Sequence, residues 1–395
     1  MINKTENSLS LEEQKAVANI FTNEYYELAY FRGITYVSYL ILQLFESIGV
    51  LGLLKDKYSS AVEIMAAFNF VPKAKYALEW MLNFLSQNNF LEKLEDKDAR
   101  KYHYQRADII DTQSLLKEGI ELDKKIIPSA NLMNYVISEY PNFFCGRKKG
   151  FEILFASDKM ALWNDYFSND NSGYNVYNYL GALAVSKWAF KGNSIRLLEL
   201  GGGTGGASSA LIEELKSKNL LSRISEYIFS DVSPIFLRLG NRAIMSRVSD
   251  SFNYSLKKLD FDKPLLEQNM GENEIDVVYA VNALHVAKNL VGSLKNIYRV
   301  LKPSGLIVFC EYCRPNIDYL LLQEFIFCLL DNYVEVDLDS NLRPVPGFLD
   351  YSHWQRNLEV AAFKNIEAIF NTDGAYHISL KGNPGILAAA IKGEK

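Results

Sequence analysis

The chain has 395 residues, of which 49% are hydrophobic and 23% are charged, and its formal net charge is −5. This length allows two or three domains, and this share of apolar residues can fill a large core. The negative charge argues against a surface built for nucleic acid or for an anionic membrane. The N-terminal sequence lacks the apolar core of a signal peptide, so the four cysteines are expected to be free thiols in a cytoplasmic protein.

Residues 1–125 are predicted to form a mostly helical domain. The apolar stretch 33–54 contains Gln43 and Glu46, which favours a buried helix over a membrane span. Residues 60–105 then predict a short amphipathic helix, a turn, a longer helix and two short strands, the order of a winged helix. The longer helix lacks the polar and basic face of a DNA-recognition helix. We therefore expect this domain to mediate dimerisation or to shape a substrate pocket.

Residues 126–190 are rich in aromatic side chains and predict a helical connector. Most of these aromatic rings are expected to fill a core. The alternative is a lid over a pocket for a planar or acyl substrate, which makes Tyr174, Tyr177 and Asn178 candidate substrate contacts. Both interpretations remain open on the sequence alone.

Strands and helices alternate from residue 191 onward, which predicts a parallel doubly wound sheet in a domain that spans residues 191–395. A helical insertion is expected at about 314–345. The chain is expected to close with an antiparallel hairpin that includes the strand-like segments YHISLK and GILAAAIK. Cys310 and Cys313 form a lone C-x-x-C without a second pair of ligands nearby, so no metal site is expected.

The segment LLELGGGTGGAS turns from a predicted strand into a predicted helix. Gly201, Gly203 and Gly205 allow the backbone of this turn to pass close to a ligand, because glycine has no Cβ. A turn of this kind often binds a pyrophosphate at the helix N-terminus. Glu199 would repel a pyrophosphate and would suit a cationic or zwitterionic ligand, such as an amino-acid moiety.

Two further acids follow the next two predicted strands. Asp231 ends the second strand, where a carboxylate can accept hydrogen bonds from both hydroxyls of a ribose. Asp260 ends the third strand, where it can meet an adenine amino group, and Phe261 can cover the ring. Three strands in order, each ending in a suitable residue, predict a nucleoside-binding edge.

These segments resemble those of class I S-adenosylmethionine-dependent methyltransferases, and more narrowly those of the C-methyltransferase domains of polyketide synthases. The resemblance covers about residues 140–395, whereas the first domain resembles the winged-helix domain of small-molecule O-methyltransferases. It implies a Rossmann-like seven-stranded sheet, S-adenosyl-L-methionine as cofactor and S-adenosyl-L-homocysteine as product. It also makes Asn282 a candidate contact for the cofactor or for an enolate oxygen. The segments that carry it are LLELGGGTGGAS, YIFSDVSPIFL, LDFD, DVVYAVNALHVAKNL and LKPSGLIVFCEY, with echoes of a lid in GFEILFASD and YNVYN and of a tail in RPVPGFLDYSHWQRNLEVAAF.

His285 follows the fourth strand of this fold and Glu311 ends the fifth. Neighbouring strands lie about 5 Å apart, so the two side chains can meet at the carboxyl edge of the sheet. A carboxylate on one imidazole nitrogen fixes the tautomer and raises the basicity of the other nitrogen. The resemblance agrees, since polyketide C-methyltransferases use a His/Glu dyad at these places. We expect His285 to act as a general base, and Glu311→Gln to be a milder change than His285→Ala.

The expected reaction is C-methylation of an acidic carbon in a polyketide-type β-ketoacyl substrate, free or bound to a carrier protein. One alternative is a phenolic O-methyltransferase with the same cofactor and base. A second is a non-catalytic regulator that senses a ligand and binds DNA, which the retained acids, glycines and histidine argue against. We expect a homodimer that binds neither nucleic acid nor membrane.

Overall fold

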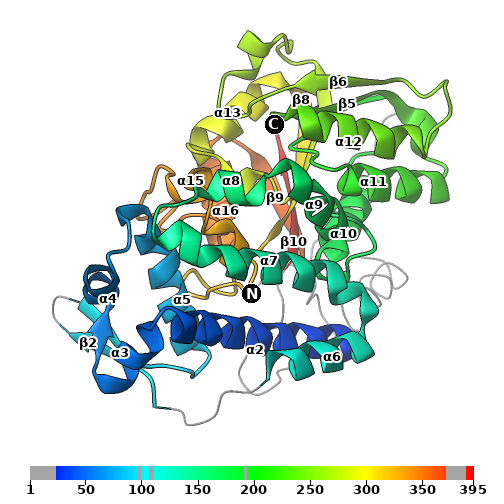
Figure 1. Cartoon of the computed structure of the whole chain (residues 1–395). Helices are drawn as coiled ribbons and strands as arrows, with labels where there is room; N and C mark the ends of the chain where they lie inside the picture. Colours follow the sequence, from blue (N-terminus) through cyan, green and yellow to red (C-terminus); the bar gives the residue numbers. More distant parts are fainter. Residues whose placement is uncertain (1–23, 97–98, 106–110, 191–193, 371–387) are drawn as a thin grey trace. The chain divides into compact units, whose positions relative to one another are not determined.

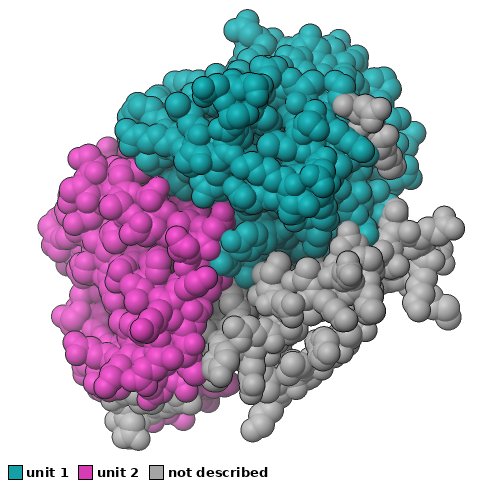
Figure 2. All heavy atoms as spheres, turned by 90° about the vertical axis from the view of Figure 1, so that its right-hand side faces the viewer, with its two compact units in different colours: residues 1–28, 174–315, 350–395 teal, residues 29–173, 316–349 magenta. Residues whose placement is uncertain are grey.

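The computed structural model describes residues 24–96, 99–105, 111–190, 194–370 and 388–395. The chain forms two compact units, coloured separately in Figure 2. Unit 1 comprises residues 1–28, 174–315 and 350–395, and unit 2 comprises residues 29–173 and 316–349. This division differs from the boundaries expected at 125 and 190, because residues 316–349 pack with the N-terminal part of the chain.

Unit 1 is built on the seven-stranded sheet expected from the sequence, in the order β6-β5-β4-β7-β8-β10-β9. The first five strands in this order are parallel, and β10 runs antiparallel to both of its neighbours. The C-terminal antiparallel pair is therefore present as β9 and β10, while YHISLK lies outside the described residues. The strands are β4 (Ile195–Leu200), β5 (Ile224–Asp231), β6 (Tyr254–Lys258), β7 (Ile275–Val281), β8 (Leu301–Tyr312), β9 (Lys364–Phe370) and β10 (Ala388–Glu394).

The middle parts of the central strands are apolar because both faces of the sheet are covered. In β7, Val277, Val278 and Ala280 are all buried. Helix α12 packs against β5 and β6, and helix α13 packs against β8 and α16 (Figure 1). The covering helices are α10 (Ser172–Trp188), α11 (Gly206–Ser217), α12 (Pro234–Met245), α13 (Leu290–Val300) and α16 (Tyr351–Val360).

Unit 2 is mostly helical, with one small antiparallel sheet in the order β1-β3-β2. The segment expected to read as helix, turn, helix and two strands contains α4, α5, β2 and β3 in that order. Its N-terminal elements are α2 (Glu24–Ser47), α3 (Val50–Asp56), β1 (Ser59–Ser60), α4 (Ala61–Phe68), α5 (Lys75–Gln87), β2 (Glu92–Asp96) and β3 (Ala99–His103). They are followed by α6 (Thr112–Leu122), α7 (Ile127–Phe144), α8 (Gly150–Leu154) and α9 (Met160–Tyr166).

Residues 316–349 complete unit 2 with the short helices α14 (Glu324–Phe327) and α15 (Asp331–Val334). The carboxylate of Glu324 is fully buried and accepts hydrogen bonds from Trp80 Nε1 at 3.2 Å and from the Tyr333 hydroxyl at 2.7 Å. A buried carboxylate is stable only when donors replace its water shell. The hydrogen bond from Trp80 therefore attaches the insertion to α5 of the N-terminal segment.

In the part of the chain that the structure describes, no single helix is long and apolar enough to cross a membrane. One pair of helical segments, 32–47 and 50–56, meets the length and composition criteria only when the two are taken together, and the pair is bent by 92°.

Candidate active site

Most of the predicted site residues of unit 1 lie at the carboxyl ends of β4, β5, β6, β7 and β8 or in the loops that follow these strands. Parallel strands end at the same edge of a sheet, and ligands of open α/β sheets bind outside this carboxyl edge. We call residues 201–205 the glycine turn, residues 259–264 the β6 loop and residues 283–288 the histidine turn.

The glycine turn has left-handed backbone geometry at Gly201, Gly203 and Gly205, with φ of 63°, 57° and 84°. A Cβ at Gly201 would lie 2.7 Å from the Cβ of Ala283, so this turn touches the histidine turn. A Cβ at Gly203 would meet no protein atom nearer than the Gly201 carbonyl oxygen at 4.0 Å. The turn therefore leaves open space beside Gly203, as a cradle for a ligand requires.

Glu199, at the end of β4, is buried beside α11. Its Oε2 accepts hydrogen bonds from the Ser208 hydroxyl and, at 2.6 Å, from the Tyr227 hydroxyl. Burial raises the pKa of this carboxyl group to about 7. Its Oε1 is buried and has no hydrogen-bond partner among the described residues. One acceptor on Glu199 thus remains for a ligand group or an internal water.

Asp231, at the end of β5, joins two loops of the carboxyl edge. Its Oδ2 accepts a hydrogen bond from the Gly203 backbone N–H at 3.0 Å, and its Oδ1 accepts one from the Ser233 N–H at 2.7 Å. Burial raises the pKa of this carboxyl group, while the backbone donors oppose the shift. Each carboxylate oxygen has further lone pairs that can accept a second hydrogen bond.

Asp260 and Phe261 lie in the β6 loop, just after β6. The Gln268 side chain holds the Asp260 backbone on both sides, since it accepts from the Asp260 N–H and donates to the Asp260 carbonyl, each at 2.8 Å. The ring of Phe261 lies 3.9 Å from the position of a Cβ on Gly201. The structure therefore brings Phe261 to the glycine turn. Gln268 was not predictable, because an isolated loop glutamine has no periodic or motif signal.

His285 and Glu311 meet, as the strand order predicted. His285 lies in a short 3-10 helix (Leu284–Val286), and its Nδ1 is 2.8 Å from Glu311 Oε2. Both side chains are buried, with exposed fractions of 4% and 0%. Glu311 Oε1 also accepts hydrogen bonds from the backbone N–H groups of Ala283, Leu284 and His285 at 3.0, 2.8 and 3.3 Å. The carboxylate thus holds the histidine turn as well as the imidazole.

This arrangement fixes the tautomer of His285. A carboxylate is an acceptor only, so Nδ1 must carry the proton that lies between the ring and Glu311 Oε2. In the neutral ring the basic lone pair is then on Nε2. The opposite tautomer would place two lone pairs against each other at 2.8 Å.

Asn282, the residue after β7, has a left-handed backbone with φ of 46°. Its Oδ1 accepts a hydrogen bond from the Tyr312 N–H at 2.9 Å, which fixes the orientation of the amide. Its Nδ2 is buried and has no hydrogen-bond partner among the described residues. A buried amide N–H₂ without a partner is costly. Asn282 therefore offers a donor to a bound molecule.

Tyr174, Tyr177 and Asn178 lie on α10 and are buried. The ring centroid of Tyr177 is 3.9 Å from that of Tyr312, the residue after Glu311. The structure thus brings Tyr177 close to the end of β8, together with Asn282. Tyr312 was not predicted as a site residue, although its position next to Glu311 at the end of a strand indicated that it lies near the site.

Comparisons with known proteins find similarity to methyltransferases. Residues 198–307 match a family model described as a methyltransferase domain. The chain is 29% identical over 233 residues to the methyltransferase calH of Penicillium decumbens, and this match covers 59% of each chain. It is 24% identical over 246 residues to a highly reducing polyketide synthase of Pyrenophora dematioidea, which covers 62% of this chain and 9% of the synthase. The chain therefore spans only part of the length of these relatives.

Solved structures share the fold over almost the whole chain. The CurJ carbon methyltransferase matches with a TM-score of 0.80, over 97% of this chain and 96% of that one, at 18% identity. The CMeT domain of the citrinin polyketide synthase matches with a TM-score of 0.76, over 96% and 94% of the two chains, at 16% identity. At such identities the likeness establishes the fold.

Proposed function

The chain carries a class I S-adenosylmethionine-dependent methyltransferase domain, and we propose that it methylates an acidic carbon of a polyketide-type substrate. The observation that carries this proposal is the buried His285–Glu311 pair at the carboxyl edge of the sheet. Its relatives include polyketide synthases, which supports a substrate of the β-ketoacyl type.

The cofactor S-adenosyl-L-methionine fits the residues of the carboxyl edge. We assign the ribose hydroxyls to Asp231 and the adenine to Asp260 and Phe261. The open space beside Gly203 supports a ligand that lies against the glycine turn. The acceptor left on Glu199 Oε1 supports a contact with the methionyl ammonium group, directly or through a water. When bound, this cofactor supplies an electrophilic methyl group and leaves as S-adenosyl-L-homocysteine.

His285 acts as the general base in this proposal. Its Nε2 removes a proton from the carbon between the two carbonyl groups of the substrate, and the imidazole becomes positively charged. Glu311 Oε2 stabilises that charge at 2.8 Å from Nδ1. Because both side chains are buried, the pair works where water competes little for the proton. A positioned base of this kind contributes about 10²–10⁴ in rate.

The removal of the proton places negative charge on the substrate oxygen. The N–H₂ of Asn282 supplies a donor for that oxygen, because its amide orientation is fixed by Tyr312. Tyr177 and Asn178, with Tyr174 one turn earlier on α10, form the side of the site that faces the substrate. The alternative role of this donor is to bind the cofactor carboxylate. Turnover and cofactor affinity, both measured for Asn282→Asp, separate the two roles. Asn282→Asp lowers turnover alone in the first case, and lowers cofactor affinity in the second.

The substrate is proposed to be either a free small molecule or an acyl group on a carrier protein. Residues 1–125 are proposed to serve dimerisation or substrate recognition, and the protein is proposed to form a homodimer. Sedimentation of the full chain tests the dimer. A gel shift at physiological salt tests the absence of DNA binding, and a clear shift would support the regulator alternative.

Product analysis tests the reaction itself. The protein is incubated with methyl-labelled S-adenosylmethionine and a β-ketoacyl thioester, free or on a carrier, and the position of the label is read by mass spectrometry and NMR. We expect a carbon-bound methyl group. Without cofactor, the wild type is expected to exchange the substrate α-hydrogen for deuterium, and His285→Ala is expected not to do so. Transfer to a phenolic oxygen without carbon exchange would instead identify an O-methyltransferase.

A further inference from the structure

We infer that Asp262 is a positioning residue that ties the adenosine side of the site to the histidine turn. This inference rests on the proposed function, and it concerns how occupation of the nucleoside site reaches the base. Asp262 belongs to the β6 loop, directly after the proposed adenine contacts Asp260 and Phe261.

The contacts of Asp262 cross from one loop to the next. Its Oδ1 accepts hydrogen bonds from the backbone N–H of Lys288 at 2.9 Å and from the Ser293 hydroxyl at 3.0 Å. Its own N–H donates to Asp260 Oδ1 at 3.1 Å. Lys288 is the last residue of the histidine turn, and Ser293 is buried on α13. One carboxylate oxygen therefore connects the adenine-side loop to the end of the histidine turn and to the first turn of α13.

The β6 loop has contacts with its neighbours on both sides of Asp262. Gln268 fixes the Asp260 backbone from both sides, and Phe261 lies against the glycine turn. On the other side, Glu311 fixes the start of the histidine turn through three backbone N–H groups. Asp262 holds its end. The histidine turn thus has one anchor in the catalytic pair and one in the nucleoside site.

Three variants test this role through kinetics. Asp262→Ala removes the acceptor, and Asp262→Asn retains an oxygen for Lys288 and Ser293. The control, Glu267→Ala, removes a carboxylate from an exposed position between β6 and β7. We expect Asp262→Ala to lower kcat about tenfold with a smaller change in KM for the acyl substrate, since small displacements of a base are costly. Asp262→Asn and Glu267→Ala should stay within about twofold of wild type. Equal kcat for Asp262→Ala and Glu267→Ala would overturn the inference.

A second measurement does not depend on turnover. 5′-Methylthioadenosine has no methionyl group, so under the proposed function it engages only the adenosine side. In hydrogen exchange, we expect it to protect the β6 loop and also the amides of Val286 and Ala287, which close the histidine turn by bonds to Ala283 and Leu284. In Asp262→Ala, the β6 loop should still be protected, but Val286 and Ala287 should not. In Asp262→Asn, the β6 loop and both amides should be protected, as in the wild type.

The outcomes separate the inference from the proposed function. Undiminished protection of Val286 and Ala287 in Asp262→Ala would overturn the inference alone. Failure of the wild type to bind 5′-methylthioadenosine and S-adenosylhomocysteine would overturn the proposed nucleoside site, and the inference with it. A melting temperature for each variant shows whether a loss of kcat comes from a loss of folded protein, and restoration by Asp262→Asn distinguishes positioning from stability.

Discussion

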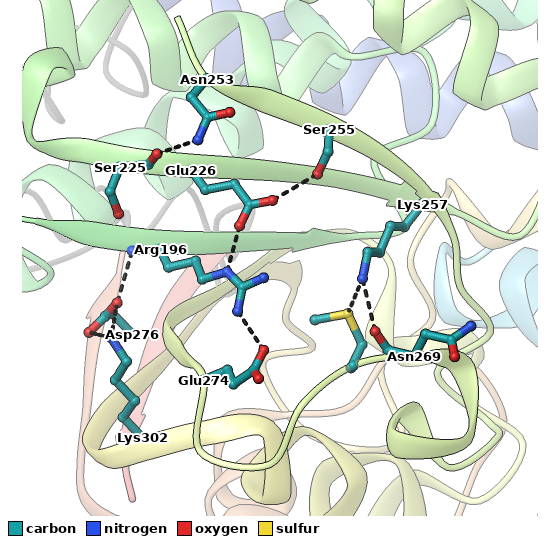
Figure 3. Close-up of polar contacts among 11 residues, drawn as sticks. Arg196, Ser225, Glu226, Asn253, Ser255, Lys257, Asn269, Glu274, Asp276 and Lys302 are labelled. Atoms are coloured by element: carbon teal, nitrogen blue, oxygen red, sulfur yellow. Dashed lines mark hydrogen bonds and ion pairs between the residues drawn. The ribbon is translucent and has the colours of Figure 1, made fainter.

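Acidic side chains lie at both edges of the sheet in unit 1, but they have different partners at each edge. At the amino edge they are paired with cations (Figure 3). Arg196 donates to Glu226 and to Glu274, each at 2.6 Å, and Lys302 pairs with Asp276 at 2.7 Å. These ion pairs link the beginnings of strands β4, β5, β7 and β8. Their charges are satisfied within the protein.

At the carboxyl edge, Glu199, Asp231 and Glu311 are held by hydroxyl, backbone N–H and imidazole groups, whereas Asp260 forms an ion pair with Lys263 at 3.0 Å. Glu199 accepts from two hydroxyls, Asp231 from two backbone N–H groups, and Glu311 from three backbone N–H groups and one imidazole. Among the described residues, none of these three carboxylates pairs with a lysine or arginine within 4.0 Å. An acid held by neutral donors keeps its charge available for a ligand cation, for ribose hydroxyls or for an imidazolium ion. The partner of an acid, rather than its position in the sequence, therefore distinguishes an acid that stabilises the sheet from one that can meet a ligand.

The largest effect is expected from His285→Ala. Turnover should fall by about 10²–10⁴-fold, because the proposed general base is lost. Affinity for S-adenosylhomocysteine, measured by calorimetry, should stay nearly unchanged, since the imidazole does not contact the adenosine. Turnover at the wild-type rate would show that the base lies elsewhere and that the neutral partners of Glu311 have only a structural role.

Glu311→Gln is expected to be nearly as damaging. Three backbone N–H groups require an oxygen at Oε1, so the amide N–H₂ must face the imidazole. His285 Nδ1 would then have to accept, and Nε2 would carry the proton and lose its basic lone pair. A carboxylate-to-amide change that reverses a histidine tautomer in this way lowers turnover by about 10⁴-fold in serine proteases.

The double variant sharpens this expectation. His285→Ala with Glu311→Gln should be little worse than either single change, because residues of one catalytic unit are not additive. A mild Glu311→Gln variant, with turnover within a few-fold of wild type, would contradict the fixed amide orientation.

Asp231→Ala should weaken cofactor binding without changing the chemical step. Hydrogen bonds to a charged acceptor contribute roughly 1.5–3 kcal/mol each, so the loss of ribose contacts should lower affinity by about 10²-fold or more. The substitution also frees the Gly203 and Ser233 N–H groups, which adds to the loss. Calorimetry with S-adenosylhomocysteine measures the effect. Unchanged affinity would remove Asp231 from the proposed site.

Glu199→Gln should change how stability depends on pH. The pKa of Glu199 is raised from 4.5 to about 7 in the folded chain, so the folded state binds this proton more tightly than the unfolded state. Protonated Glu199 therefore contributes its full share to the free energy of unfolding below about pH 4.5, and this contribution is lost as the pH rises through about 7. Relative to Glu199→Gln, the wild type should therefore lose at most about 3 kcal/mol between about pH 5 and pH 8. Parallel melting curves across this range would contradict the raised pKa.

The smallest effect is expected at the amino edge. Arg196→Met removes ion pairs that are partly open to solvent, so it should cost about 1 kcal/mol of stability. Turnover and cofactor affinity, measured below the melting transition, should be unchanged. A selective loss of turnover would show that the two edges are not independent and would weaken the comparison.

The sequence was sufficient for the sheet and for much of the edge. β-branched runs and glycine turns predicted the alternation of strands and helices, and the shared edge of parallel strands predicted that His285 and Glu311 meet. The roles of these residues remain proposals. The three N–H donors on Glu311 were not predictable, because backbone groups carry no sequence signal. They bring the expected effect of Glu311→Gln close to that of His285→Ala.

Other features depended on contacts that are distant in the chain. Glu199 looked like an acid that faces a ligand, but Ser208 and Tyr227 occupy one of its oxygens inside the core. The insertion after residue 314 looked like part of the sheet domain, since it interrupts that domain in sequence. Trp80 and Glu324 are 244 residues apart, and no local pattern links an indole to a buried glutamate at that separation.

The Glu324 contacts have a consequence for synthesis on the ribosome. Trp80 emerges early, but its acceptor emerges only after most of the sheet in unit 1 has been made. Until then, the face of α5 that carries Trp80 has no carboxylate partner, and unit 2 cannot finish its core.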